Sequence, residues 1–245
     1  MDFNRSYNQR LFEDNAIRRY LHNGRFRWFK AKCQQYHVGD MRMIELGCFD
    51  GRLIDFCPVS PVHYEGYDAG WEGGLEIAMK KFNGRPDRIV RRALEPKDIS
   101  HIANASFNVG AAMETLEHVP PELLGDYLNE MSRVIDGHFF VTVPNEKGFV
   151  FLTKYMVKAF LGSNQKYTPT EVLNATLGRL AKVPRDDHKG FDYDVLINQL
   201  REFFDVVEVE PIPFKLLPRS LGFTIGIVAR TRRQVKTRHV ASVVD

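Results

Sequence analysis

The sequence predicts an α/β protein built on one mostly parallel sheet. Short apolar runs that suit buried strands alternate with segments of helical spacing along most of the chain. An apolar run at 41–46 leads into a tight turn bounded by Gly47 and Gly51, as expected where a buried parallel strand feeds a helix. The last two apolar runs are joined by PIPFKLLPRSLG, which has no helical pattern, so this pair is expected to be antiparallel.

Each element follows from its own local pattern. Strands are expected at 42–46, 62–67, 88–93, 107–113, 138–143, 204–209 and 221–230. Helices are expected at 52–56, 71–82, 121–134 and 191–203. Prolines and glycines mark several of the ends: Pro58 and Pro61 follow the first helix, Gly84 and Pro86 follow the second, and Pro120 precedes the third.

Three regions lie outside this alternation. Residues 1–38 are polar and aromatic with helical spacing, which predicts an N-terminal helical cap ahead of the domain at 39–230. Residues 149–183 begin with FVFLTKYMVKAFLG and predict a helical insertion after the fifth strand, over the substrate side. This apolar helix could line a pocket, dock a lipid-linked acceptor or lie at a membrane surface, with core packing as the default. Residues 231–245 predict a basic, mobile tail.

Composition limits the classes of function. The chain has 245 residues, 44% of them hydrophobic, which suffices for a large core, and its net charge of +3 does not by itself indicate a nucleic-acid partner. The three cysteines, Cys33, Cys48 and Cys57, lack CxxC spacing, which argues against a disulfide framework and for a reducing compartment. No secretory signal is visible in MDFNRSYNQR, and no run approaches the ~20 apolar residues of a membrane span. A cytoplasmic protein is therefore expected.

A ligand site is expected at the carboxyl ends of the first two strands. In an open α/β sheet, ligands bind beyond these ends, at the point where the strand order reverses. Gly47 and Gly51 have no side chains, so a ligand can approach the backbone closely. Asp68 follows about twenty residues later, where a carboxylate can accept both hydroxyl groups of a ribose. A role for Asp68 as a helix N-cap is the structural alternative.

The order of four segments carries a family resemblance. These segments are ELGCFDG, EGYD, SFNVGAAMETLEHV and FFVTVPN. Together they resemble the class I S-adenosylmethionine-dependent methyltransferases over roughly residues 40–230. The resemblance implies a Rossmann-like, seven-stranded, mostly parallel sheet with its last strand antiparallel. A nicotinamide dehydrogenase fits less well, because the turn lacks G-x-G-x-x-G.

The resemblance also implies a cofactor site. Glu45 would orient the methionine amino group, Gly47 and Gly51 would admit the methionyl portion, Asp68 would hold the ribose, and Met113 would lie near the sulfur. Cys48 and Phe49 belong to the same turn and complete the predicted cofactor-binding set. The sequence departs from the family pattern at Phe49, where a third glycine is common, and at Asn108, where an acid is usual. The ring of Phe49 is predicted to form a wall against the cofactor or the substrate.

A second set of side chains predicts the chemistry. Glu114, Glu117 and His118 lie in METLEH at the end of the fourth strand. If this segment begins a helical turn, all three face the same way, and such a set can share a divalent cation. The structural alternative is a carboxylate at a helix N-terminus and a core histidine. His188, in DDHKGF, could supply a fourth ligand.

The E-x-x-E-H motif with the later histidine resembles two families of metal-dependent O-methyltransferases. One modifies the 3′-terminal ribose 2′-hydroxyl of small RNAs, and the other acts in the ubiquinone pathway. The likeness implies that Glu114, Glu117, His118 and His188 bind a divalent cation, with Mg²⁺ or Mn²⁺ favoured and Zn²⁺ as an option. Such an ion lowers the pKa of a hydroxyl group and fixes it in line with the methyl group. Without metal, His118 or His188 could act as the general base.

The expected function is therefore methyl transfer from S-adenosylmethionine to a hydroxyl group that has a neighbouring oxygen. A small molecule or a glycan is favoured as the acceptor, and RNA ranks below it because no separate RNA-binding domain is visible. Peripheral membrane contact is a further expectation. Two other classes stay open: a non-catalytic module that binds the cofactor, and a nucleic-acid binder that works through the basic tail.

Overall fold

The computed structural model describes residues 16–160, 167–186 and 188–232. The N-terminal part of the predicted cap and all but the first two residues of the predicted tail lie outside these ranges. Within them, no helix is both long enough and apolar enough to cross a bilayer.

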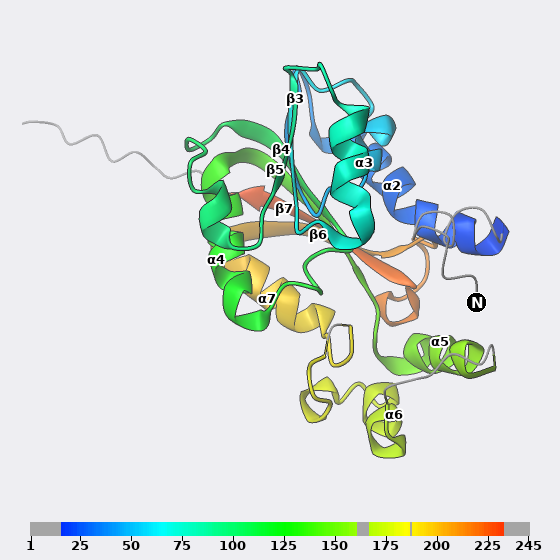
Figure 1. Ribbon diagram of the computed structural model, residues 1–245. Helices are drawn as coiled ribbons and strands as arrows, with labels where there is room; N and C mark the ends of the chain where they lie inside the picture. Colours follow the sequence, from blue (N-terminus) through cyan, green and yellow to red (C-terminus); the bar gives the residue numbers. More distant parts are fainter. Residues whose placement is uncertain (1–15, 161–166, 187, 233–245) are drawn as a thin grey trace, which may run out of the picture.

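Seven strands form one sheet in the order β3-β2-β1-β4-β5-β7-β6 (Figure 1). Their bounds are β1 (Arg42–Leu46), β2 (His63–Asp68), β3 (Arg88–Arg92), β4 (Phe107–Met113), β5 (Ile135–Pro144), β6 (Phe204–Ile212) and β7 (Thr224–Thr231). β1 to β5 pair in parallel, whereas β7 runs antiparallel to both β5 and β6. The predicted Rossmann-like sheet with an antiparallel last strand is therefore confirmed.

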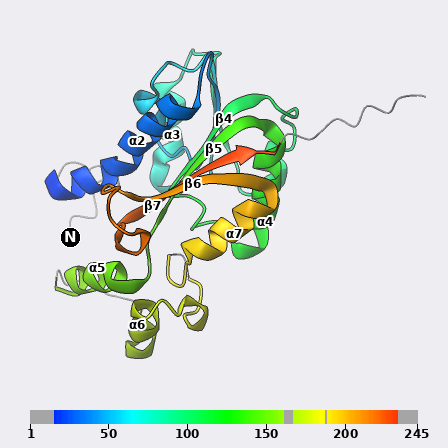
Figure 2. The ribbon, with the colours of Figure 1, turned by 180° about the vertical axis from the view of Figure 1, so that it is seen from behind.

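Helices cover both faces of the sheet (Figure 2). The α-helices are α2 (Ala16–Tyr36), α3 (Gly74–Lys81), α4 (Pro121–Val134), α5 (Gly148–Phe160), α6 (Pro169–Thr176) and α7 (Tyr193–Phe203). The 3₁₀ helices are η1 (Arg52–Phe56), η2 (Trp71–Gly73), η3 (Pro96–Ile99), η4 (Leu180–Lys182) and η5 (Arg219–Leu221). The segment expected as one helix at 71–82 begins with η2, because Gly70, just before η2, and Gly73, its last residue, adopt φ values of 84° and 73°.

Two hydrophobic clusters hold the helices against the sheet. α4 and α7 pack on one face through residues such as Leu128, Met131 and Leu200, all fully buried. α2, η1 and α3 pack on the other face through residues such as Phe29 and Leu53. Full burial of one such side chain contributes roughly 1.5–3 kcal/mol, so the two clusters fix the sheet that carries the site.

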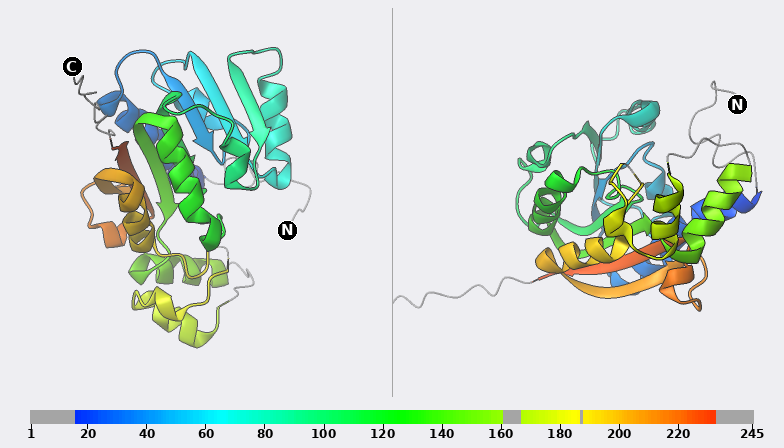
Figure 3. Two further views of the ribbon diagram at one scale, coloured as in Figure 1. Left: turned by 90° about the vertical axis from the view of Figure 1, so that its left-hand side faces the viewer. Right: turned by 90° about the horizontal axis from the view of Figure 1, so that it is seen from below.

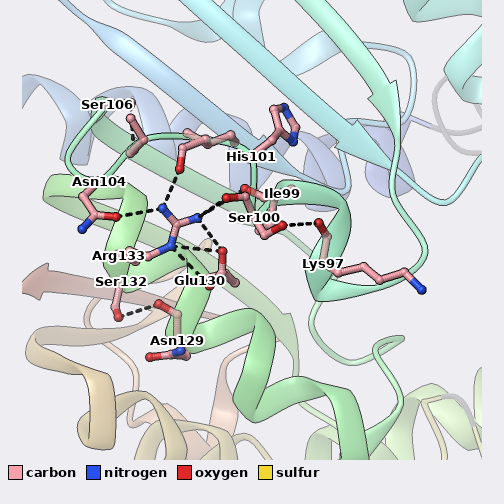
Figure 4. A network of polar contacts seen from close by, with 12 residues as sticks. Lys97, Ile99, Ser100, His101, Asn104, Ser106, Asn129, Glu130, Ser132 and Arg133 are labelled. Atoms are coloured by element: carbon pink, nitrogen blue, oxygen red, sulfur yellow. Dashed lines mark hydrogen bonds and ion pairs between the residues drawn. The ribbon is translucent and has the colours of Figure 1, made fainter.

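Arg133 ties α4 to the connection between β3 and β4 (Figure 4). Its guanidinium donates to the carbonyl oxygens of Ile99, Ser100 and Ile102 and pairs with Glu130 on its own helix. Because a loop has few contacts of its own, these bonds hold the segment before β4 against the last turn of α4. The same loop begins at Ala93, beside the cavity described below.

The insertion after β5 forms a small unit of its own beyond the carboxyl ends of the strands (Figure 3). Phe151, Ala175, Leu180 and Val183 form its buried centre, which joins α5, α6 and η4. The helical insertion is therefore present after the fifth strand. Its role over a substrate stays a prediction.

Candidate active site

One cavity of about 630 Å³ opens at the carboxyl ends of β1, β2 and β4. Its walls come from α2, the turns after these three strands and the segment that carries His188. The predicted site residues that line it are Glu45, Gly47, Cys48, Phe49, Asp68, Met113, Glu114, His118 and His188. All the predicted cofactor residues except Gly51 therefore share one cavity with the two predicted catalytic histidines, and the predicted metal ligand Glu117 does not line it.

The turn after β1 needs glycine for two separate reasons. Gly47 and Gly51 adopt φ values of 76° and 66°, which disfavour any residue with a Cβ. A Cβ at Gly47 would overlap the side chain of Thr115, and one at Gly51 would overlap the ring of Phe82. The turn is therefore closed down onto its neighbours, and its backbone faces the cavity.

Asp68 joins this turn to the end of β2. One carboxylate oxygen accepts the N–H of Phe49 at 2.8 Å, and the other accepts the N–H of Gly70 at 2.7 Å. These two bonds fix the carboxylate while each oxygen keeps a further lone pair. Asp68 can therefore accept hydroxyl groups of a ligand in the cavity without losing its structural bonds.

Glu45 is buried at the end of β1 and accepts a hydrogen bond of 2.7 Å from the Tyr64 hydroxyl. Burial raises the pKa of Glu45 to about 8, against the opposing effect of that hydrogen bond. A cationic group placed in the cavity would favour its charged form. This environment suits the amino group of a methionyl moiety.

Phe49 adopts a φ of 45°, a left-handed conformation that is unusual for a bulky residue. Its ring lies 6.5 Å from that of Trp71, between centroids, and a Cβ at Gly74 would overlap it. The ring is thus held against the start of α3 and lines the cavity. This placement is compatible with the predicted wall, which stays a prediction.

The METLEH segment does not form the helical turn that the spacing suggested. Glu114 adopts a left-handed φ of 54°, and the next residues form a turn in which the N–H of His118 donates to the carbonyl of Thr115 at 3.0 Å. Because Glu114 itself is left-handed, its side chain does not join those of Glu117 and His118. The prediction that Glu114, Glu117 and His118 share one helical face is therefore wrong.

Three of the four predicted metal ligands do come together. Each of Glu117, His118 and His188 offers one ligand atom within 4.8 Å of the others, and the two imidazole rings lie 4.3 Å apart. Glu117 is only 1% exposed, and neither of its carboxylate oxygens has a hydrogen-bond partner. Burial, together with the charge of Glu114, raises the pKa of Glu117 well above its ordinary value. An unpartnered buried carboxylate beside two imidazoles fits a cation site.

Glu114 has different partners. Its carboxylate pairs with the Arg25 guanidinium of α2 at 2.9 Å and accepts the Thr224 hydroxyl of β7 at 2.8 Å. Burial opposes the charged form, but Arg25 and Thr224 outweigh it, so the pKa of Glu114 lies below its ordinary value. In this arrangement Arg25 supplies the positive charge that a metal ion would otherwise supply.

A short backbone hairpin positions His188. Asp186 and Lys189 exchange backbone hydrogen bonds of 3.1 and 3.0 Å across it. Arg185, just before it, donates to the carbonyl oxygen of Glu117 and lies over the ring of Phe191, 4.8 Å from its centroid. Arg185 therefore fastens the segment that carries His188 to the turn that carries Glu117 and His118.

A comparison of the sequence with protein-family models and with curated proteins gives no match. Solved structures do match. An S-adenosylmethionine-dependent methyltransferase from Clostridium acetobutylicum has a TM-score of 0.58 at 15% identity, covering 92% of this chain and 96% of that one. A Haloferax volcanii protein, solved in complex with the Trm112 methyltransferase activator, has a TM-score of 0.56 at 13% identity, covering 92% and 98%. The CurJ carbon methyltransferase has a TM-score of 0.57 at 16% identity, covering 91% and 57%.

This chain has the fold of the class I S-adenosylmethionine-dependent methyltransferases. The identities to these three structures are 13–16%, so the likeness concerns the fold and not the acceptor. One of these neighbours is named for transfer to carbon, and the methyltransferase fold therefore leaves the acceptor atom open.

Three contributors to this methyltransferase-fold site were not predicted from the sequence. Arg25 reaches the cavity from α2. Thr224 of β7 bonds Glu114, and Arg185, just before the hairpin, bonds the carbonyl oxygen of Glu117. Arg25 lies within RFRWF, an aromatic run that indicates a packed helix and gives no sign of an ion pair 89 residues away. Only the topology of the sheet brings these segments together.

Proposed function

We propose that this chain is an S-adenosylmethionine-dependent O-methyltransferase that uses a divalent cation. The observation that carries the proposal is the single cavity in which the turn after β1 and Asp68 face His118, His188 and the neighbouring Glu117. A methyl donor and its acceptor must lie within a few ångströms of each other. One cavity lined both by the cofactor residues and by the two histidines can hold them together. The methyltransferase fold supports the choice of donor.

The proposed cofactor residues are Glu45, Gly47, Cys48, Phe49, Gly51, Asp68 and Met113. Asp68 would accept the ribose hydroxyls, and Glu45 would face the amino group of the methionyl portion. The missing Cβ at Gly47 makes room for the Thr115 side chain, and the turn lines the cavity with its backbone. Phe49 would close the side of the cavity next to α3.

Glu117, His118 and His188 would hold the cation. A cation bound there lowers the pKa of an acceptor hydroxyl and stabilises the resulting oxyanion. One carboxylate with two imidazoles favours Mn²⁺ or Zn²⁺ over Mg²⁺, which prefers oxygen ligands. Glu114 would join as a fourth ligand only after its pair with Arg25 opens.

The proposed acceptor is a hydroxyl group with an oxygen on the adjacent carbon, on a small molecule or a glycan. Two vicinal oxygens can both approach a cation that three protein ligands leave partly open. The cavity volume of about 630 Å³, which must include the cofactor, favours a small acceptor. An RNA 3′-terminal ribose offers the same pair of oxygens and is the alternative substrate.

The ion pair between Arg25 and Glu114 favours a second candidate, a metal-free methyltransferase. There, His118 or His188 would take the proton of the acceptor hydroxyl as a general base. Arg25 would balance the charge of Glu114 in place of a metal ion, and the two imidazoles would lie beside the acceptor.

An acceptor screen with labelled S-adenosylmethionine tests the proposal. Catechols, sugars with vicinal diols and RNA 3′ ends are offered to the protein after chelation, and again with Mn²⁺, Zn²⁺ or Mg²⁺ restored. We expect methylation of a small diol or catechol that chelation abolishes and Mn²⁺ or Zn²⁺ restores. Activity that survives chelation would support the metal-free candidate. An Asp68→Ala variant should lose all transfer, whereas the exposed Glu122→Gln variant should keep it.

A further inference from the structure

The strand order indicates where the base of the proposed cofactor would lie. From the centre of the sheet to one edge, β4, β1, β2 and β3 are neighbours and run parallel. In the proposed function, Glu45 at the end of β1 faces the methionyl amino group, and Asp68 at the end of β2 holds the ribose. A nucleoside that continues in this direction brings its base to the end of β3, where Ala93 and Leu94 line the cavity.

The backbone at this end of the cavity is already engaged. The carboxylate of Asp98, in η3, accepts the N–H groups of Leu94 and Glu95 at 2.8 and 3.0 Å. The N–H of Ala93 donates to the carbonyl oxygen of Asp68 at 2.9 Å. These three N–H groups therefore have partners, and a donor to the base must come from a side chain.

Tyr127 brings a side-chain donor to this part of the cavity. α4 packs against η3, and Tyr127 lines the cavity from α4 with only 4% of its surface exposed. Burial, together with the nearby charges of Asp98 and Glu95, raises the pKa of Tyr127 to about 12. The hydroxyl therefore keeps its proton at neutral pH and can donate it in a hydrogen bond.

A second tyrosine in the cavity wall gives a direct comparison. Tyr67 also lines the cavity, but its hydroxyl donates to Glu65 at 2.6 Å and lies 3.4 Å from Nε2 of His101. The hydroxyl of Tyr127, by contrast, forms no hydrogen bond with any residue that the structure describes. Because buried polar groups are nearly always hydrogen-bonded, an unbonded hydroxyl in a cavity wall indicates a contact with the ligand.

We propose that the Tyr127 hydroxyl donates a hydrogen bond to a ring nitrogen of the adenine base, an assignment that rests on the proposed function. Ala93 and Leu94 offer the base apolar contact, which does not depend on the positions of its nitrogen atoms. The hydroxyl adds that dependence, because a ring nitrogen accepts a hydrogen bond and a C–H group in its place does not. Tyr127 is thus a specificity-determining residue that reads the base from α4.

Calorimetric titration of the full-length protein with adenosylhomocysteine tests the assignment. Tyr127→Phe removes only the hydroxyl, and its Kd for adenosylhomocysteine should be about three- to tenfold higher, as expected for the loss of one neutral hydrogen bond. The titrations are repeated with the 1-deaza, 3-deaza and 7-deaza analogues, in each of which a C–H group replaces one ring nitrogen. With one of the three analogues the natural protein and Tyr127→Phe should bind equally, because the acceptor of the bond is already absent.

Tyr193→Phe is the matched control. Tyr193 is buried in the same hydrophobic cluster at 5% exposure but does not line the cavity, so its variant should bind adenosylhomocysteine like the natural protein. Thermal unfolding checks that both variants are folded.

Two results would overturn the role of Tyr127 alone. One is an unchanged Kd of Tyr127→Phe for adenosylhomocysteine, and the other is a loss of affinity that persists with all three analogues. In either case, a loss of binding in Asp68→Ala would show that the proposed donor still holds. Failure of the natural protein to bind adenosylhomocysteine would instead overturn the proposed donor and the role of Tyr127 together.

Discussion

The turn after β1 and the turn after β4 line one cavity but are built in opposite ways. The turn after β1 is defined by backbone: two glycines with positive φ, and Asp68 bonded to two backbone N–H groups. The turn after β4 is defined by side chains, and its partners come from α2, β7 and the 185–191 segment. The first turn is nearly complete without a ligand, whereas the second contains a buried carboxylate without a hydrogen-bond partner.

This difference separates binding from chemistry. A backbone-defined turn suits a cofactor whose shape does not vary, because the cradle is formed in advance. A site formed by side chains from several elements can change its charge and its ligands. Arg25 and Glu114 form an ion pair there, although Glu114 was predicted to bind a metal ion. The comparison therefore predicts that changes in the first turn abolish cofactor binding, and that changes in the second spare it.

The largest effect is expected from Gly47→Ala. The new Cβ would overlap Thr115, and the alanine would have to adopt a φ of 76°. Adenosylhomocysteine binding should therefore fall below detection by calorimetry. Gly84→Ala is the matched control, since Gly84 has a φ of 74° with nothing within 4 Å of the added Cβ. The control should lose about 1–2 kcal/mol of unfolding free energy from the backbone alone, and Gly47→Ala a further 1–3 kcal/mol or so from overpacking. Equal cofactor affinity in the two variants would contradict the backbone cradle.

Breaking the Arg25–Glu114 pair should give the next largest effect. Arg25→Met leaves a buried carboxylate without its partner, and we expect a loss of about 3 kcal/mol in the free energy of unfolding, measured by urea denaturation. Adding Glu114→Gln to this variant should recover at least about 1 kcal/mol, because the two changes share one interaction. Strict additivity of the two losses would show that the pair is not a unit.

Glu117→Gln is expected to lower methyl transfer by about 100-fold or more, while adenosylhomocysteine binding is unchanged. A carboxamide is a weak metal ligand, and loss of even an outer-shell partner costs roughly 10–100-fold. In thermal unfolding, Mn²⁺ or Zn²⁺ should raise the Tm of the natural protein and of Glu122→Gln, but not that of Glu117→Gln. An equal rise in all three would place the metal elsewhere.

The smallest predicted effect is a proton released when the cofactor binds. Burial raises the pKa of Glu45 to about 8, so the unliganded protein holds this proton at pH 7. A bound ammonium group lowers that pKa, and up to about one proton should leave near pH 7. Release should fade near pH 4, where both states are protonated, and near pH 10, where both are ionised. Calorimetry in buffers of different ionisation enthalpy measures it, and Glu45→Gln should abolish it.

The fold could be predicted because its signals are local. The alternation of strands and helices, the loop at 211–222 and the Gly47–Gly51 turn each depend on a few adjacent residues. η2 and the start of β5 at Ile135 were not predicted, since one helix was expected at 71–82 and the fifth strand was expected to begin at residue 138. Tertiary packing decides such boundaries.

The site could be predicted only in part. Glu117, His118 and His188 converge as expected, because parallel strands bring their carboxyl-end turns to one edge. The direction of Glu114 could not be predicted, because it depends on one left-handed φ and on Arg25 from a distant helix. Sequence spacing shows only which residues are close along the chain. The partner of a buried charge such as Glu114 is decided by the packing of distant elements.

A crystal structure with adenosylhomocysteine and Mn²⁺, analysed by anomalous scattering, tests the central claim most directly. The account predicts the ribose hydroxyls on Asp68 and an anomalous peak bound by Glu117, His118 and His188, in the same cavity. A nucleoside that avoids Asp68, or a manganese ion bound away from these three side chains, would contradict it.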